Sequence, residues 1–169
     1  MRLLERSSAL DLWPCCHTLA TNRDQEHHGM PAPFVTSRRV EFRDTDAAGI
    51  MHFASIMALM EECEHEFLRH LDLPLFRTVE GGKISWPRVS AQCDFKSPAR
   101  FEDLLKIAVS VQHLGKRSIT YQFEIRCSDR LIASGTMTSV CCFVGTNKLE
   151  PADIPDDFVT KLSDYLIVD

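Results

Sequence analysis

Residues 53–71, FASIMALMEECEHEFLRHL, carry the pattern that decides the fold. The apolar positions recur at helical spacing, at Phe53, Ile56, Met60, Cys63, Phe67 and Leu71. Charged residues fall mostly elsewhere on the helical wheel, and no glycine or proline interrupts the segment. The pattern predicts one long amphipathic helix, and Pro74 and Gly81-Gly82 mark the connection that follows it.

Runs with a period of two lie on both sides of this helix. One of them, FVTSRRVEF at residues 34–42, precedes it. Four follow it: RVSAQCDF (88–95), LLKIAVSVQH (104–113), SITYQFEIRC (118–127) and LIASGTMTSVCCFV (131–144). Alternating apolar and polar residues are typical of strands, and the short breaks between consecutive runs predict antiparallel hairpins. The last run is mixed, which indicates a strand buried on both faces for part of its length.

The end of the chain, PDDFVTKLSDYL at residues 155–166, predicts a short helix with acids in its first turn. A long helix with one apolar face needs a sheet to cover that face. The order of the elements therefore predicts an α+β fold in which an antiparallel sheet curls around the long helix.

The composition suits one globular domain. The 169 residues are 44% hydrophobic and carry a formal net charge of -5. This charge provides no basic field for nucleic acid, and the apolar runs fall short of the ~20 residues of a membrane helix. Seven cysteines without a C-x-x-C motif favour a reduced, cytoplasmic protein. We expect core thiols at Cys63, Cys93, Cys127 and Cys141.

The first 33 residues differ from the rest of the chain. They show no sustained period, lack the apolar segment of a secretory signal and contain too many acids for a transit peptide. We expect residues 1–33 to be a disordered extension and residues 34–169 to be the folded domain. Because regular patterning begins just after Met30, we hypothesise that translation starts at this residue.

The junction before the long helix, EFRDTDAAGIMHF at residues 41–53, places two carboxylates one residue apart. With the helix that follows, it resembles the hotdog-fold acyl-CoA thioesterases, and among them the 4-hydroxybenzoyl-CoA thioesterase branch. The residues in register with that family's pattern are Asp44, Asp46, Gly49, Phe53, Glu61, Glu66, Phe67 and Leu68. Cys63 stands in place of the usual alanine and Ile56 in place of a common tyrosine. The resemblance extends from Phe34 to the C-terminus.

The resemblance implies a hotdog fold, with a five-stranded antiparallel sheet wrapped around one long central helix. It also implies a homodimer or homotetramer, with sheets joined edge to edge and active sites at the subunit interface. The implied substrate is an acyl-CoA, so coenzyme A arrives as part of the substrate and no metal or redox cofactor is implied. Acyl carrier protein as the carrier and a non-catalytic acyl-CoA binder are the alternatives. The fold also hosts dehydratases, whose sites we do not recognise here.

Thioester hydrolysis needs a nucleophile or activated water, and donors for the oxygen that becomes negative. An ionised aspartate can act as the nucleophile or activate the water. The unpaired N–H groups at the beginning of a helix can donate to the oxygen that becomes negative. The resemblance assigns catalysis to Asp46, and Asp44 is expected to hold the turn after residues 41–43 finish the strand. Gly49 would allow a sharp turn and close approach of the substrate, and the amide of Phe53, or one near it, would polarise the carbonyl.

Plainer roles compete with these assignments. An aspartate just before a helix is often a cap or turn residue, which is the alternative for Asp46. His52 could line the site, orient water or bind Asp46, or simply pack at the helix start. Because a second thioesterase branch uses a helix carboxylate, Glu61 is the fallback catalytic residue.

A basic turn at Lys116, Arg117 and Ser118 falls where the family brings cations and hydroxyls to the nucleotide end of coenzyme A. Phosphates attract such cations through charge-assisted hydrogen bonds. A solvated hairpin turn is the alternative. Further candidates for the same contact are Lys96, Arg100 and Arg88. The histidines and cysteines do not form a metal-binding set.

Overall fold

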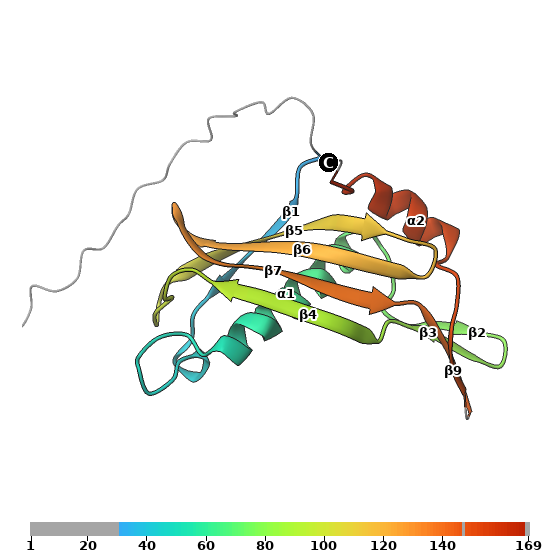
Figure 1. Ribbon diagram of the computed structural model, residues 1–169, viewed down its shortest axis with the longest axis horizontal. Helices are drawn as coiled ribbons and strands as arrows, with labels where there is room; N and C mark the ends of the chain where they lie inside the picture. Colours follow the sequence, from blue (N-terminus) through green and yellow to red (C-terminus); the bar gives the residue numbers. More distant parts are fainter. Residues whose placement is uncertain (1–30, 147, 168–169) are drawn as a thin grey trace, which may run out of the picture.

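One antiparallel sheet and one long helix form the centre of the computed structural model, which describes residues 31–146 and 148–167 (Figure 1). The sheet has five strands, in the spatial order β1 (Phe34–Arg39), β5 (Leu104–Leu114), β6 (Ser118–Cys127), β7 (Arg130–Val140) and β4 (Arg88–Phe95). Helix α1 (Phe53–His70) lies across one face of this sheet. The predicted α+β architecture, a five-stranded sheet around one long helix, is confirmed.

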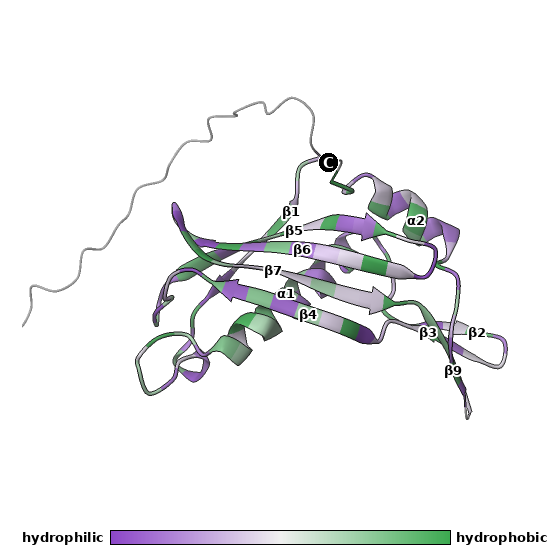
Figure 2. Cartoon of the chain, in the orientation of Figure 1, coloured by the Kyte–Doolittle hydropathy of each residue, from purple (hydrophilic) through white to green (hydrophobic). Residues whose placement is uncertain are grey.

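The core lies between the apolar side of α1 and the inner face of the sheet. Met60, Cys63 and Phe67 of the helix are fully buried, and the ring of Phe67 meets that of Tyr121 edge to face, 6.4 Å between centroids. On β6 and β7 the residues alternate in polarity, as the mixed colours in Figure 2 show. Burial of each large apolar side chain stabilises the fold by about 1.5–3 kcal/mol, so this interface holds helix and sheet together.

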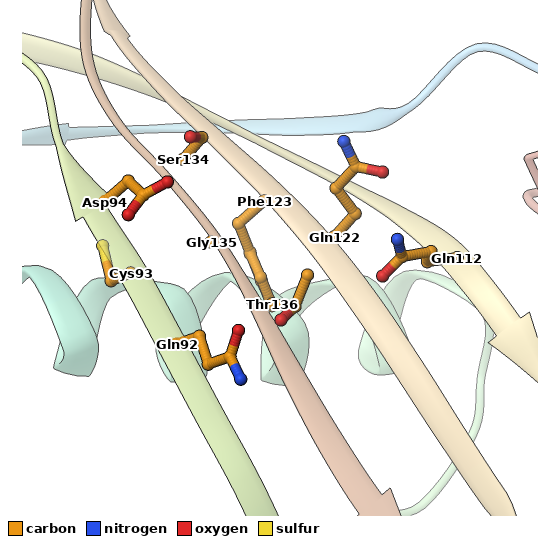
Figure 3. A pocket seen from close by; sticks show the side chains of 9 residues that line it. All are labelled: Gln92, Cys93, Asp94, Gln112, Gln122, Phe123, Ser134, Gly135 and Thr136. Atoms are coloured by element: carbon orange, nitrogen blue, oxygen red, sulfur yellow. The ribbon is translucent and has the colours of Figure 1, made fainter.

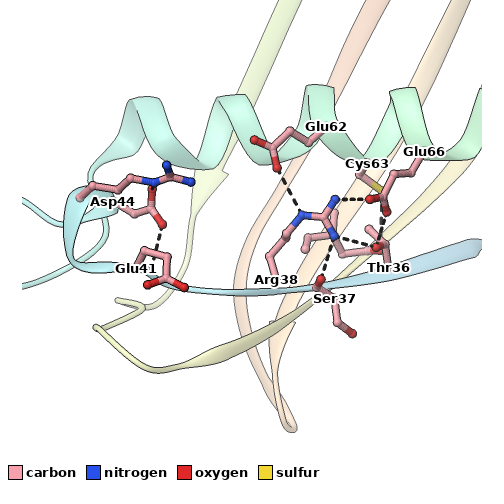
Figure 4. A network of polar contacts seen from close by, with 10 residues as sticks. Thr36, Ser37, Arg38, Glu41, Asp44, Glu62, Cys63 and Glu66 are labelled. Carbon is pink, nitrogen blue, oxygen red and sulfur yellow. Dashed lines mark hydrogen bonds and ion pairs between the residues drawn. The ribbon is translucent and has the colours of Figure 1, made fainter.

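Polar contacts fasten β1, which is one edge of the sheet, to α1 (Figure 4). Arg38 on β1 lies 3.3 Å from the Glu62 carboxylate and also pairs with Glu66. The hydroxyl of Thr36 donates a hydrogen bond to the same Glu66. Glu66, in register with the family motif, therefore has a structural contact here.

A second, four-stranded sheet was not predicted from the sequence. Its strands, in spatial order, are β2 (Arg77–Val79), β3 (Gly82–Ser85), β8 (Cys142–Gly145) and β9 (Lys148–Pro151). The prediction of one strand over residues 131–144 is wrong, because the N–H of Cys141 turns away to donate to the carbonyl of Arg117. Helix α2 (Asp156–Ser163) packs near β5 of the five-stranded sheet, and the ring of its Phe158 lies 4.8 Å from that of Trp86.

Two further sequence predictions are corrected. Residues 41–43 do not finish the first strand, because β1 ends at Arg39 and Phe42–Asp44 form a single turn of 3-10 helix, η1. Strands β4 and β5 do not form a hairpin, because β4 pairs with β7 whereas β5 lies between β1 and β6. The segment between β4 and β5 therefore crosses the end of the sheet.

The predicted short C-terminal helix is confirmed by α2. Of the predicted core thiols, Cys63 and Cys141 are buried, whereas Cys93 and Cys127 are only half-buried because they lie near the edge and the end of the sheet. No helix within residues 31–146 and 148–167 is long and apolar enough to cross a membrane. Residues 1–30 of the predicted extension 1–33, with the hypothetical start at Met30, lie outside the described part of the chain.

Candidate active site

The loop between η1 and α1 is a tight turn that fixes Asp46. The N–H of Asp46 donates to the carbonyl of Ile50 at 2.9 Å, and the N–H of Gly49 donates back to the carbonyl of Asp46 at 3.0 Å. One carboxylate oxygen of Asp46, Oδ1, accepts the N–H of Ala48 at 2.8 Å. The other oxygen accepts no hydrogen bond from the described residues, so it is available to a substrate or a water.

Gly49 has a φ of +70°, a conformation that other residues adopt only with strain. A Cβ atom added to Gly49 would meet no other atom within 4 Å. The turn therefore needs glycine for its backbone conformation, and close packing within the chain does not require it.

Asp44 differs from Asp46 in what it contacts. Its Oδ2 accepts the N–H of Glu41 at 2.9 Å, and its backbone carbonyl accepts the N–H of His52 at 2.7 Å. Both contacts close η1 and connect it to the start of α1, so Asp44 has the turn-holding position expected of it.

A pocket of about 520 Å³ opens beside Asp46. Its walls are the loop, the first turn of α1 and the segment that leaves β4; the lining residues are Asp46, Ile50, Met51, Phe53, Ile56, Phe95, Lys96, Ser97, Pro98 and Ala99. We call it the Asp46 pocket. Its volume lies within the ~300–1,000 Å³ of small-molecule sites.

The start of α1 leaves one amide free at the Asp46 pocket. His52 is the N-cap, and its Nδ1 accepts the N–H of Ala54 at 3.1 Å. The N–H groups of Ser55 and Ile56 donate to the carbonyl of His52. The N–H of Phe53 donates to no acceptor among the described residues, and the helix dipole favours negative charge there.

Of the roles expected for His52, the structure places it at the cap. Its ring lies against that of Phe53, 4.5 Å between centroids, and it makes no hydrogen bond to Asp46. Because Nδ1 accepts a hydrogen bond from an N–H group, the ring proton is on Nε2.

Glu61 lies about 12 Å along α1 from Phe53, since the helix rises ~1.5 Å per residue. It lines a second pocket, of about 240 Å³, with His65, Leu75, Phe76, Ser85, Trp86, Pro87 and Arg88. We call this the Arg88 pocket. The fallback carboxylate and Asp46 are therefore in different pockets of one chain.

The predicted coenzyme A residues lie at the far end of the sheet from Asp46. Lys116 and Arg117 both contact the carboxylate of Asp153, at 3.2 and 2.8 Å, and their hydrogen bonds lower its pKa. Ser118 begins β6, whose opposite end is near the Asp46 pocket, roughly 30 Å away for ten residues of strand. One chain alone does not bring Asp46 and this turn together.

A third pocket, of about 210 Å³, lies on the outer face of the sheet (Figure 3). Its amide and hydroxyl groups come from Gln92, Gln112, Gln122, Ser134 and Thr136. Asp94 also lines it but is paired with Lys96 at 3.3 Å. Its lining includes no helix residue, and its one carboxylate is paired, so the Asp46 pocket is the better candidate for thioester chemistry. Within the described part of the chain, no three His, Cys, Asp or Glu residues converge to hold a metal ion.

Comparison with known proteins decides the family. The model of the thioesterase-like superfamily matches residues 40–162. The chain belongs to the thioesterase-like superfamily. The expectation of a thioester hydrolase with the hotdog fold is thereby confirmed.

Individual relatives agree with this assignment. The 1,4-dihydroxy-2-naphthoyl-CoA hydrolase of Nostoc punctiforme is 27% identical over 76% of this chain and 86% of its own. The solved structure of a gentisyl-coenzyme A thioesterase is 31% identical, with a TM-score of 0.67 over 76% of this chain and 99% of its own. A 1,4-dihydroxy-2-naphthoyl-CoA thioesterase from Synechocystis, 24% identical over 78% of this chain and 96% of its own, shares the fold with a TM-score of 0.68.

Sequence reasoning missed parts of both pockets. Ser97 lines the Asp46 pocket. The sequence does not signal this position, because the short break after β4 predicts a hairpin and not a crossing of the sheet. The Arg88 pocket was also not foreseen. The i, i+4 spacing of Glu61 and His65, which puts both on one side of α1, was the signal available for it.

Proposed function

We propose that the protein hydrolyses acyl-CoA thioesters, with Asp46 as the catalytic carboxylate. The observation that carries the proposal is that one pocket of substrate size is lined by Asp46 and by Phe53, whose N–H has no acceptor among the described residues. A carboxylate and an oxyanion donor are the two groups that the reaction requires.

The chemistry follows from the contacts of Asp46. Ala48 holds Oδ1, which leaves Oδ2 to attack the thioester carbon or to take a proton from an attacking water. As the new C–O bond forms, the carbonyl oxygen gains negative charge, which the N–H of Phe53 and the helix dipole stabilise. The C–S bond then breaks and coenzyme A leaves as the thiolate, which needs no strong acid. If Asp46 attacks directly, water hydrolyses the resulting anhydride in a second step.

The exposed edge of the sheet supports a homodimer. Strand β4 pairs with β7 on one side and has no partner on its other side among the described residues. Val89 and Phe95 on β4 are 61% and 52% exposed, although both are large apolar residues. A free strand edge with apolar side chains is a pairing surface, and a second copy of β4 fits it in antiparallel orientation.

Antiparallel pairing would combine the two pockets. The Arg88 pocket is built from the residues that lead into β4, and the Asp46 pocket from those that leave it. Within one chain, the two ends of this eight-residue strand are about 23 Å apart. Reversal of the second copy places the Arg88 pocket of one subunit beside the Asp46 pocket of the other, and it moves the partner's basic turn at residues 116–118 toward the same end.

The composite site favours a polar aromatic acyl group. Trp86 and Phe76 of the Arg88 pocket offer aromatic surfaces, and Glu61 offers a hydrogen-bond acceptor at the same place. A hydroxylated aryl group would use both, and the Nostoc relative is named for such a substrate. The nucleotide end of coenzyme A would lie near Lys116 and Arg117, whose two positive charges exceed the single charge of Asp153.

The test is release of free thiol from a panel of acyl-CoA thioesters. Asp46→Asn should lower kcat by at least about a thousandfold, because it removes the nucleophile or base while preserving the acceptor for Ala48. Asp44→Asn is the matched control and should retain most of the activity. Near-normal turnover by Asp46→Asn would overturn the assignment, and wild-type protein that binds acyl-CoA without releasing thiol would indicate a binder.

A further inference from the structure

Arg88 connects three groups from two elements of the fold. As the first residue of β4, it reaches across to α1, where its guanidinium lies 3.0 and 2.7 Å from the two carboxylate oxygens of Glu64. It also donates to the hydroxyl of Ser139 at 2.6 Å and lies 3.6 Å from the carboxylate of Glu61. One planar guanidinium thus joins a strand edge, a neighbouring strand and the helix.

The side chains of Glu64, Ser139, Arg88 and Glu61 lie in a series from the interior of the protein to the Arg88 pocket. Glu64 and Ser139 are each only 1% exposed, the side chain of Arg88 is 23% exposed and that of Glu61 is 51% exposed. A buried ion pair is weak evidence for stability, because desolvation of both charges offsets their attraction. The geometry therefore points to a positional role, in which the buried end holds the guanidinium and the guanidinium holds Glu61.

The charges in this cluster leave Glu61 as the acceptor. Burial raises the pKa of Glu64 to about 7 although Arg88 opposes the rise, and burial lowers the pKa of His65 beside it. Tyr121 of β6 packs near Glu64 and keeps its proton, because burial raises its pKa well above 10. The half-exposed Glu61 is thus the carboxylate of this cluster that faces the pocket.

We propose that Arg88 is a positioning residue that holds the Glu61 carboxylate in the acyl end of the composite site, so that the enzyme selects acyl groups carrying a hydrogen-bond donor. This proposal rests on the proposed function. Glu64 and Ser139 hold the guanidinium of Arg88 in place. Loss of Arg88 frees Glu61 to turn into solvent, and the selectivity falls even though Asp46 and the Phe53 amide are unchanged.

The experiment compares two thioesters that differ by one hydroxyl, 4-hydroxybenzoyl-CoA and benzoyl-CoA. The readout is the ratio of their kcat/KM values. Glu61→Met and Arg88→Met should each lower this ratio about tenfold, and the double variant should lower it no further, because both changes remove the same contact. Arg88→Lys, which keeps the charge but loses the planar fork, should restore part of the ratio.

Controls separate the possible outcomes. Arg126→Met, which removes the exposed pair of Arg126 with Glu124, should leave the ratio at the wild-type value. Glu61→Met changes a half-exposed side chain, so it tests the proposal even if Arg88→Met fails to fold. Equal losses on both thioesters in dimeric variants, or additive effects in the double variant, would overturn the inference alone. Wild-type protein that hydrolyses neither thioester would overturn the proposed function and this inference with it.

Discussion

At the Phe95 end of β4, the Asp46 pocket has the exposed aromatic side chains of Phe53 and Phe95, whereas at the Arg88 end the guanidinium of Arg88 pairs with the buried carboxylate of Glu64. The first pocket has a carboxylate oxygen of Asp46 and an amide of Phe53 that are unpaired among the described residues, which suits bond breaking. The second has a guanidinium fixed by Glu64 and Ser139, which suits recognition of a group that does not react. The difference supports our proposal that chemistry and selectivity are divided between the two ends of one strand.

Mixed dimers test this division with the largest expected effect. Asp46→Asn should inactivate the Asp46 pocket, and Glu61→Arg should block the Arg88 pocket with a longer, repelled cation. When one subunit carries each change, one of the two composite sites contains both native residues. Dimers isolated through two different affinity tags should therefore recover about half of the wild-type kcat, measured as thiol release.

The control is a dimer with Asp46→Asn in both tagged subunits, which should stay inactive. If each site used residues of a single chain, the mixed dimer would be as inactive as this control. That result would remove the interface site from the proposal.

The second prediction concerns the buried carboxylate of Glu64, at the Arg88 end of β4. Burial raises the pKa of Glu64 in the folded protein to about 7, from the ordinary value of 4.5 that applies in the unfolded chain. Between these values the folded state holds a proton that the unfolded state has lost, so the free energy of unfolding should fall as pH rises from 4.5 to 7. Glu64→Gln should remove roughly 1–3 kcal/mol of this fall, measured by urea unfolding at several pH values. His65 is common to both proteins and does not affect the difference, so identical slopes would contradict the assignment.

The smallest expected effect concerns His52, and it separates its role as the N-cap of α1 from a role in catalysis at the Asp46 pocket. His52→Ala removes the acceptor for the N–H of Ala54 and should cost about 1 kcal/mol of stability. His52→Asn keeps an acceptor at the N-cap and should restore most of that loss in thermal unfolding. If His52 acted as a base, the asparagine variant would keep its stability but lose turnover; we expect its kcat to change less than twofold.

Features whose pattern continues over many residues of the sequence were predictable. Features set by pairing between strands far apart in the sequence were not. Helix α1 was predictable because eighteen residues repeat one apolar stripe, and the loop with Asp46 because its motif lies between two clear elements. Strands β2, β3, β8 and β9 have three or four residues each, too few to show a period of two. The position of β4 at the sheet edge depends on its pairing with β7, which no local pattern records.

Glu64 shows a signal that could have been used. It lies four residues after Met60, so a helical wheel places this carboxylate on the apolar side of α1. A charged residue at a core position requires a buried partner, and an arginine near the start of a strand was available as Arg88.

The unpaired edge of β4 has a consequence for how activity depends on concentration. If each working site needs the beginning of one copy's β4 and the end of another's, a single chain holds two half-sites and no complete one. A newly synthesised subunit would then leave cellular thioesters intact until it meets a second copy. Specific activity would fall on dilution below the dissociation constant of the dimer, which makes assembly itself the step that switches the enzyme on.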